Sequence, residues 1–354
     1  MKIVFAIPGM GFGGAERVVS ILANKMVQEH EVRIILTSGD SKKAYPLSGE
    51  IDLKAIPQEY SVNKRWIIFR KLCKDFKADV VLAFMDTVGI MASCYLFGTG
   101  IPVIISERND PSEKTRQLGF GFSILQKISF VLASGYVFQS EGARNYYPAI
   151  CQRKCSIILN PLDVEKLPSR EYGSIEKTIV SVGRLHPQKN HKLLITSFSE
   201  SKFCKAGYTL HIYGEGDLRE ELERLIESYG MQDKIFLEGN QKNILSRIKN
   251  AGVFVFTSNY EGLPNALIEA MAMGIPSIST DCSPGGARML INDRENGRLI
   301  PCYNEQALID AMDEWYDNPE KMYAAGIRGK NIRDMVNTST IVEKWIRFIN
   351  KRIY

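Results

Sequence analysis

The chain has 354 residues, of which 45% are hydrophobic and 24% charged, a balance typical of a soluble globular protein with room for two domains. No apolar run reaches the roughly 20 residues of a membrane-spanning helix, and the first residues are typical of a strand rather than a signal peptide. The seven scattered cysteines favour a reducing compartment and no zinc site, so we expect a cytoplasmic protein.

Charge is distributed unevenly. Residues 1–159 carry 20 Lys and Arg against 14 Asp and Glu, whereas residues 160–354 carry 25 against 26. A basic N-terminal half favours an anionic partner, either a membrane surface or a nucleic acid.

Short β-branched runs alternate with amphipathic helical stretches from the first residue onward. The first half begins with a strand at 3–7 and a helix at 14–28, and further strands are expected at 32–37, 51–56, 80–84, 102–106, 136–139 and 156–159. This alternation predicts a parallel sheet with helices on both faces.

The same pattern restarts after Asn160-Pro161. The second set of strands is expected at 178–182, 209–213, 234–237, 253–257, 276–280 and 298–300. The chain is therefore an α/β protein with two doubly wound, Rossmann-like domains, at 1–159 and 160–337. We expect the last helix, about 338–354, to pack back on the first domain. Two such domains facing across a cleft would bind ligands at the carboxyl ends of their strands.

Loops that follow the strands carry the candidate site residues. In the first domain, Gly9-x-Gly11-x-x-Gly14 leads into a helix whose N-terminus favours phosphate. Such a match alone is weak and could serve only a tight turn. In the second domain, Arg184 and Lys189 follow the first strand and could hold a diphosphate, or could be solvated surface charges.

Two further loops belong to the second domain. After the next strand come Tyr213-Gly214-Glu215-Gly216, where a base could lie against the backbone, and Asp217, which could cap the following helix. The segment 257–276 holds Glu261 just before a helix and Glu269 inside it, among Ala, Leu, Ile and Met. A carboxylate in so apolar a helix needs a partner, and ribose hydroxyls would supply one.

These motifs together resemble glycosyltransferase family 4, whose members are retaining enzymes of GT-B fold. The resemblance covers nearly the whole chain. It is carried by Gly13-Gly14-Ala15-Glu16, by Gly183-Arg184-Leu185 with Lys189-Asn190, and by Glu261-x7-Glu269 within EGLPNALIEAMA. The segment 281–286, DCSPGG, is similar to that of bacterial members that build surface glycans.

The resemblance implies a role for each residue. Glu261 would contact the donor sugar, Glu269 the ribose, and Arg184 with Lys189 the diphosphate. The remaining donor contacts would come from Gly13, Gly14, Tyr213, Gly214, Gly262, Leu263, Pro264 and Asn265. The donor would be a nucleoside-diphosphate sugar, expected to be a UDP-sugar, and no cofactor would be required. The absence of any Asp-x-Asp agrees with a site that uses cations and helix dipoles instead of a metal.

One departure from the family pattern concerns the fifth strand of the first domain. Many relatives carry a histidine after it, but here the sequence continues Ser106-Glu107-Arg108-Asn109. Any of Glu107, Arg108 or Asn109 could take that place, and Asn109 could hydrogen-bond the sugar.

The expected acceptor is a saccharide linked to a lipid. Residues 64–77 are basic and amphipathic, and residues 120–131 are rich in Phe, Ile and Leu, so both suit peripheral contact with the inner face of an anionic membrane. Alternatively, Trp66, Ile67 and Phe69 pack into the core of an ordinary surface helix.

Three other functions share features with this sequence. The glycine fingerprint also fits an NAD-dependent oxidoreductase, and the architecture fits a sugar-nucleotide epimerase. A non-catalytic binding protein is the third alternative. Nucleic-acid binding is disfavoured because aromatic and basic residues do not interleave.

Overall fold

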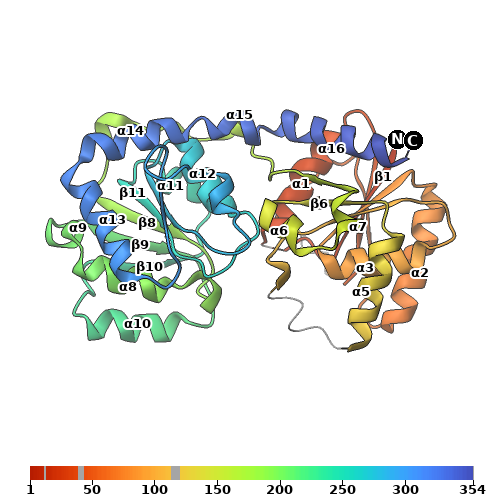
Figure 1. The fold of residues 1–354 in the computed structure, drawn as a ribbon, viewed down its shortest axis with the longest axis horizontal. Helices are drawn as coiled ribbons and strands as arrows, with labels where there is room; N and C mark the ends of the chain where they lie inside the picture. Colours follow the sequence, from red (N-terminus) through yellow and green to blue (C-terminus); the bar gives the residue numbers. More distant parts are fainter. Residues whose placement is uncertain (12, 39–43, 113–119, 354) are drawn as a thin grey trace. The chain divides into compact units, whose positions relative to one another are not determined.

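The structure is a computed structural model that describes residues 1–11, 13–38, 44–112 and 120–353. The chain folds into two compact units, the first made of Met1–Asp163 and Val336–Tyr354, the second of Val164–Met335 (Figure 1). None of the described helices combines the length and apolar character needed to cross a bilayer.

The first unit is built on a seven-stranded parallel sheet of order β3-β2-β1-β4-β5-β6-β7. Its strands are β1 (Lys2–Ile7), β2 (Glu31–Leu36), β3 (Asp52–Ala55), β4 (Val80–Phe84), β5 (Val103–Ser106), β6 (Gly135–Phe138) and β7 (Cys155–Ile157). Its helices are α1 (Gly14–Met26), α2 (Val62–Phe76), α3 (Asp86–Leu96), α5 (Phe120–Leu132), α6 (Glu141–Tyr146), α7 (Ala149–Gln152) and α16 (Thr338–Ile353).

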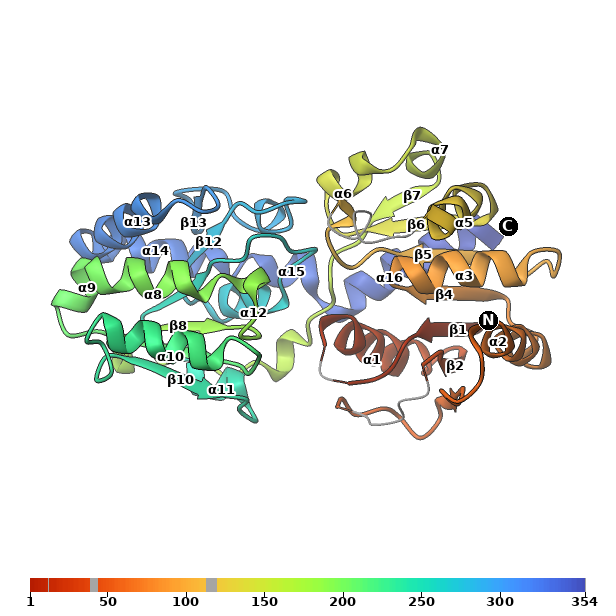
Figure 2. The ribbon, with the colours of Figure 1, turned by 90° about the horizontal axis from the view of Figure 1, so that it is seen from below.

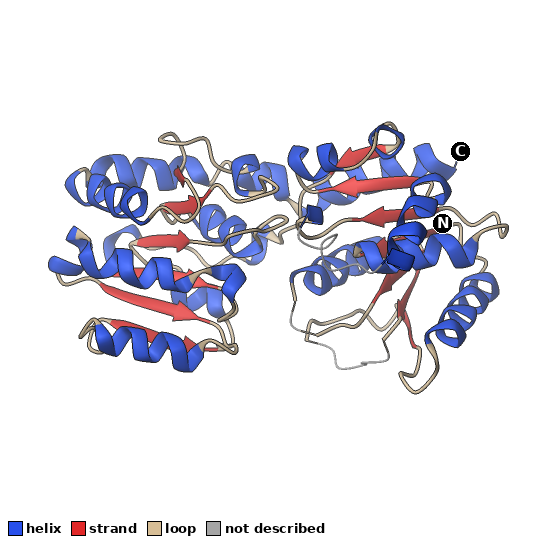
Figure 3. Ribbon diagram, turned by 60° about the horizontal axis from the view of Figure 1, so that its bottom comes forward, coloured by secondary structure: helices blue, strands red, loops and turns tan. Residues whose placement is uncertain are grey.

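Helices cover both faces of this sheet (Figure 3). Helix α1 packs against α16, whereas α3 packs against α2 and α5. The chain's last helix joins the first unit because Trp345 is fully buried and stacks on Phe84, with ring centroids 5.9 Å apart. The central strands β1, β4 and β5 are apolar except for Lys2 and Ser106 at their ends, as expected for a parallel sheet covered on both faces.

The second unit is built on a six-stranded parallel sheet of order β10-β9-β8-β11-β12-β13. Its strands are β8 (Thr178–Val182), β9 (Thr209–Tyr213), β10 (Ile235–Gly239), β11 (Val253–Phe256), β12 (Ser277–Thr280) and β13 (Arg298–Ile300). Its α-helices are α8 (His191–Glu200), α9 (Lys202–Lys205), α10 (Arg219–Ser228), α11 (Ile244–Ile248), α12 (Asn265–Met273), α13 (Glu305–Asp317), α14 (Pro319–Gly329) and α15 (Ile332–Val336).

Short 3₁₀ helices complete the second unit at Val164–Lys166, Tyr172–Ser174, Pro187–Lys189 and Ala287–Met289. Helix α8 lies between α10 and α13 (Figure 2), and α12 packs against β11, β12 and α14. Every strand runs parallel to its neighbours, so the loops that follow β8, β11, β12 and β13 all leave the same edge of the sheet.

All strands expected from the sequence are present, with ends within two residues of the expected ones. One local expectation is wrong. Asp217 does not cap the next helix, because α10 begins at Arg219 and its N-cap is Leu218, with no side-chain cap bond.

Candidate functional site

An ion pair marks the carboxyl edge of the second sheet. Lys189 ends the 3₁₀ turn after β8, and Glu261 lies in the loop after β11. Lys189 Nζ lies 2.6 Å from Glu261 Oε2, and the two side chains are 15% and 19% exposed. Lys189 Nζ also lies 4.9 Å from the centroid of the Phe256 ring. The structure thus joins two residues that the sequence separates by 72 positions.

Three side chains that the sequence analysis did not assign hold these two loops together. The Gln188 amide donates to the Tyr260 carbonyl at 2.9 Å and to Glu261 Oε2 at 3.3 Å. The Asn190 amide donates to Asn259 Oδ1 at 3.0 Å. Their sequence signal is their position beside Lys189 and Glu261, since amide side chains have no characteristic spacing of their own.

Helix α12 begins at Asn265, a few residues after Glu261. Its N-cap is Pro264, whose carbonyl accepts from Ile268 N at 3.1 Å, so this proline lies one position before the first helical turn. Gly262, Leu263 and Pro264 are buried, and Asn265 is half-buried. The first N–H groups of the helix therefore begin at Asn265, four positions after Glu261.

Glu269 occupies the second turn of α12 and is only 5% exposed. Its sequence neighbours Ile268 and Ala270 are buried as well. Glu269 is therefore not a solvated helix residue. A buried carboxylate at this depth is held by polar interactions or by a ligand.

The loop after β12 packs against the loop that carries Glu261. Glu261 N donates to the Ser283 carbonyl at 2.9 Å. A Cβ at Gly286 would lie 1.8 Å from the Gly262 carbonyl oxygen, so only glycine allows these two backbones to approach.

Tyr213 ends β9 and Gly214 follows it, and both touch the loop after β8. Gly214 has a φ of +145°, and a Cβ there would lie 2.0 Å from the Gly183 carbonyl oxygen. Tyr213 is half-buried, and burial, followed by the charge of Glu238, raises the pKa of its phenol. The two residues predicted to border the base are thus fixed against Gly183, which directly precedes Arg184.

Arg184 projects from this segment as an exposed side chain, and its backbone is held by His191. The Nε2 nitrogen of His191 lies 3.2 Å from the Arg184 carbonyl oxygen. Burial, followed by the nearby Lys189 charge, lowers the pKa of His191 to about 4, so the ring is neutral at pH 7 and donates to this carbonyl. His191 therefore adds no positive charge to this segment.

In the first unit, Gly13 and Gly14 follow β1 and open α1. Gly13 is the N-cap, in an extended conformation, and Gly14 is the first helical residue and is exposed. A Cβ at Gly13 would meet the Glu16 carboxylate at 2.1 Å, but that carboxylate ends a flexible side chain and can move. Phe12, in the middle of the motif, lies outside the described residues.

The three residues that could replace the family's histidine have different environments. Glu107 is buried, and its carboxylate accepts from Arg108 N, Asn109 N and the Tyr147 hydroxyl at 2.8, 3.1 and 2.8 Å. Arg108 lies 4.5 Å from the Phe84 ring centroid, and burial lowers its pKa to about 9. Asn109 is half-buried, and the turn that presents it is held by the bond from its N–H to the Glu107 carboxylate.

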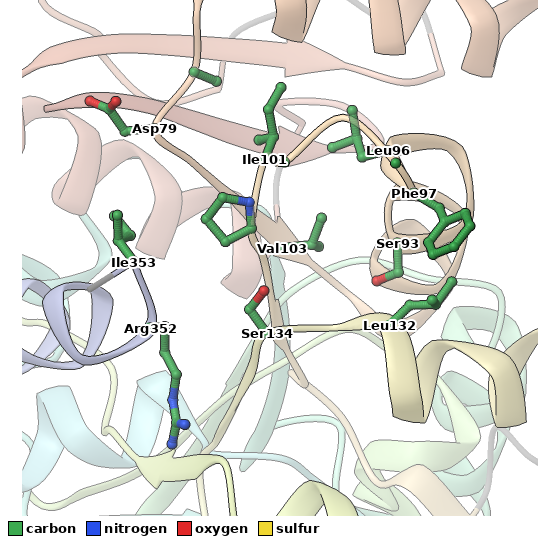
Figure 4. A pocket seen from close by; sticks show the side chains of 14 residues that line it. Asp79, Ser93, Leu96, Phe97, Ile101, Val103, Leu132, Ser134, Arg352 and Ile353 are labelled. Atoms are coloured by element: carbon green, nitrogen blue, oxygen red, sulfur yellow. The ribbon is translucent and has the colours of Figure 1, made fainter.

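A separate cavity of about 530 Å³ lies at the amino ends of the strands of the first sheet (Figure 4). Residues just before β4, β5 and β6, such as Asp79, Pro102 and Ser134, line it together with Arg352 of α16. None of the predicted site residues contributes to its lining.

The two segments considered for membrane contact differ in exposure. On α2, Trp66 and Phe69 are buried, as the core-packing alternative requires, but Ile67 is exposed, so that alternative is wrong for Ile67. On α5, Ile124 and Val131 are 47% and 66% exposed, and they share one helical face with the exposed Ile128. The side chain of Phe120 lies outside the described residues.

Comparisons with known proteins agree with this geometry. Residues 168–332 match the family model "Glycosyl transferases group 1". An N-acetyl-D-galactosaminyltransferase of Campylobacter jejuni, named for the acceptor GalNAc-α-(1→4)-GalNAc-α-(1→3)-diNAcBac-PP-undecaprenol, is 29% identical over 99% of this chain and 98% of its own. A second Campylobacter jejuni N-acetylgalactosaminyltransferase with a diphospho-undecaprenol acceptor is 29% identical over 88% of this chain and 89% of its own.

Among solved structures, HepE of Anabaena in complex with UDP is similar over 99% of this chain and all of its own, with a TM-score of 0.84 and 16% identity. The predicted GT-B fold is therefore confirmed. The family model and the full-length relatives show that the chain is a glycosyltransferase. The oxidoreductase, epimerase and non-catalytic alternatives are set aside.

Proposed function

We propose that this glycosyltransferase moves a sugar from a UDP-sugar to a lipid-linked saccharide, with retention of configuration, during synthesis of a surface polysaccharide or glycoconjugate. The observation that carries the donor half of this proposal is the Lys189–Glu261 pair beside the N-terminus of α12. A cation, a carboxylate and helix N–H groups meet there, which suits a diphosphate joined to a sugar.

In this proposal, donor binding divides the ion pair. The diphosphate takes Lys189 and the exposed Arg184, and the sugar hydroxyls take Glu261. Backbone N–H groups of Gly262, Leu263 and Asn265 place fixed dipoles beside the leaving diphosphate as its charge grows. Glu269 holds the ribose from inside α12, and Tyr213 with Gly214 borders the base.

The first unit supplies the acceptor side. Gly13 and Gly14 allow close approach to the donor, and Asn109 hydrogen-bonds the reacting sugar from a turn held by Glu107. The acceptor hydroxyl attacks the anomeric carbon on the face from which the diphosphate leaves, and the donor phosphate accepts its proton. This route uses protein cations for the leaving group, so transfer should persist in EDTA.

The acceptor assignment is supported by the relatives, both of which are named for diphospho-undecaprenol acceptors. Peripheral membrane contact belongs to the same proposal, and the exposed face of α5 is its best-supported surface. Ile124, Ile128 and Val131 form an apolar stripe that also carries the exposed Lys127. An exposed apolar face with a neighbouring cation suits contact with an anionic bilayer.

The decisive experiment offers the purified protein a panel of nucleoside-diphosphate sugars with a lipid extract from the cells that produce it. We expect one donor to add a single sugar to a lipid-linked saccharide by mass spectrometry, and the new linkage to keep the donor's anomeric configuration by NMR. Glu261→Ala should abolish transfer. Full activity in Glu261→Ala, or an inverted linkage, would contradict the proposal.

Membrane contact has its own test. Vesicles with anionic phospholipid should sediment the wild type, and the double variant Ile124→Ser with Ile128→Ser should remain in solution. Ile327→Ser, at an exposed position of α14 in the second unit, is the matched control and should sediment normally. Equal sedimentation of the double variant and the wild type would exclude this face.

A further inference from the structure

Tyr303 is the most exposed large hydrophobic side chain in the described part of the chain, at 71%. It lies in the short loop between β13 and α13, at the same sheet edge as the Lys189–Glu261 pair. Its φ is +58°, a left-handed conformation that is unfavourable for a bulky residue and common for glycine. Strained residues of this kind cluster at functional sites.

The neighbours of Tyr303 keep it in this conformation. The Asn304 side chain caps α13 by accepting from Ala307 N at 2.9 Å. On the other side, Cys302 Sγ lies 3.8 Å from the Ser258 carbonyl oxygen, in the loop that leads to Glu261. The backbone is thus fixed on both sides, and within the described residues the ring has no stacking partner and the hydroxyl no hydrogen-bond partner.

The surroundings indicate what kind of ligand suits this ring. The neighbouring Asn304 and Gln306 are exposed and polar, and Asp281, whose N–H bonds to the Ile300 carbonyl, is paired with the exposed Arg288. A protein or lipid partner would need a contiguous apolar patch, which a lone aromatic ring does not provide. A sugar ring is different, because its C–H face packs on an aromatic face while its hydroxyls reach the polar rim.

We propose that Tyr303 is a stacking platform for a saccharide ring of the acceptor. The inference rests on the proposed transfer reaction and adds to it a specificity residue on the second unit. The loop contact through Ser258 connects this platform to the loop that carries Glu261. The left-handed conformation is unfavourable, but it projects the ring outward from the carboxyl edge of the second sheet, where we place the transfer.

The test compares Tyr303→Gly, Tyr303→Phe and the matched control Arg294→Gly. Arg294 also has a positive φ, of 65°, and is exposed, but it precedes β13 and lies at the other end of that strand. Steady-state transfer is measured with saturating donor and a dilution series of the lipid extract described above.

We expect Tyr303→Gly to raise the acceptor KM about 3- to 10-fold, the range of one lost aromatic contact. Its kcat should be unchanged, and its Tm should not fall, because glycine relieves the backbone strain. Tyr303→Phe should keep the wild-type acceptor KM, and Arg294→Gly should change neither the acceptor KM nor kcat.

An unchanged acceptor KM in Tyr303→Gly would overturn the inference, as would a lower Tm with a parallel fall in kcat. A loss in Tyr303→Phe as large as that in Tyr303→Gly would overturn stacking. No transfer by the wild type would instead refute the proposed function itself.

Discussion

Replacing Lys189 by Met tests the central ion pair most directly. The substitution keeps the aliphatic stem beside Phe256 and removes the charge 2.6 Å from Glu261. Exposed pairs contribute about 0–1 kcal/mol, and breaking a fully buried pair costs about 3–5 kcal/mol. At 15% and 19% exposure, and with Gln188 still donating to Glu261, we expect a loss of about 2 kcal/mol in unfolding free energy.

The same change should affect catalysis more strongly than stability. A preorganised group that stabilises developing charge is worth roughly 10²- to 10³-fold in kcat. We therefore expect Lys189→Met to lower kcat by about that factor under saturating donor. Urea unfolding followed by circular dichroism gives the first quantity, and steady-state transfer gives the second.

A double-mutant cycle with Glu261→Gln separates the two roles. Because the side chains touch, their effects on stability should be non-additive by about 1 kcal/mol. Lys202→Met, which removes an exposed pair with Asp317 on the surface, is the control and should leave both measurements unchanged. A kcat within threefold of wild type, or strictly additive stabilities, would refute the reasoning.

Three further predictions concern buried groups. The pKa of His191 is lowered to about 4, so the contribution of its neutral ring to stability is complete above pH 6.5 and is lost as the pH falls toward 4. In unfolding experiments, His191→Asn should remove about 3 kcal/mol of this acid dependence. Gly286→Ala should destabilise the protein by about 2–3 kcal/mol and raise the donor KM, because its Cβ would strike the Gly262 carbonyl. Burial, followed by the charge of Glu107, raises the pKa of Tyr147 well above 10; stability should be complete below pH 10 and decline above it, and Tyr147→Phe should flatten that decline in Tm.

Matched controls sharpen these outcomes. Gly173→Ala, where a Cβ would meet nothing within 4 Å, should be nearly neutral, so equal effects at positions 173 and 286 would contradict the steric argument. An acid dependence that survives in His191→Asn would assign it to other groups. An alkaline decline unchanged in Tyr147→Phe would do the same for the phenol.

The sequence by itself determined that an alternation of strands and helices occurs twice, once in each domain, and it determined the order of the motifs. Local patterns suffice there, because buried parallel strands are continuous apolar runs and turn residues separate them. It also indicated the chemistry at Arg184, Lys189 and Glu261, since charged residues directly after apolar strands lie at the carboxyl edge of the sheet.

Only the tertiary structure decided which of these residues touch. The parallel register of β8 and β11 brings Lys189 to Glu261, and the loop after β12 reaches Gly262 only because Gly286 has no side chain. The role of Gln188 is equally non-local, because its partners Tyr260 and Glu261 lie 72 and 73 positions away. The neutral state of His191 follows from its burial, which only the fold provides. Tyr303 had no sequence signal, because its exposure and positive φ result from anchors at Ser258 and α13.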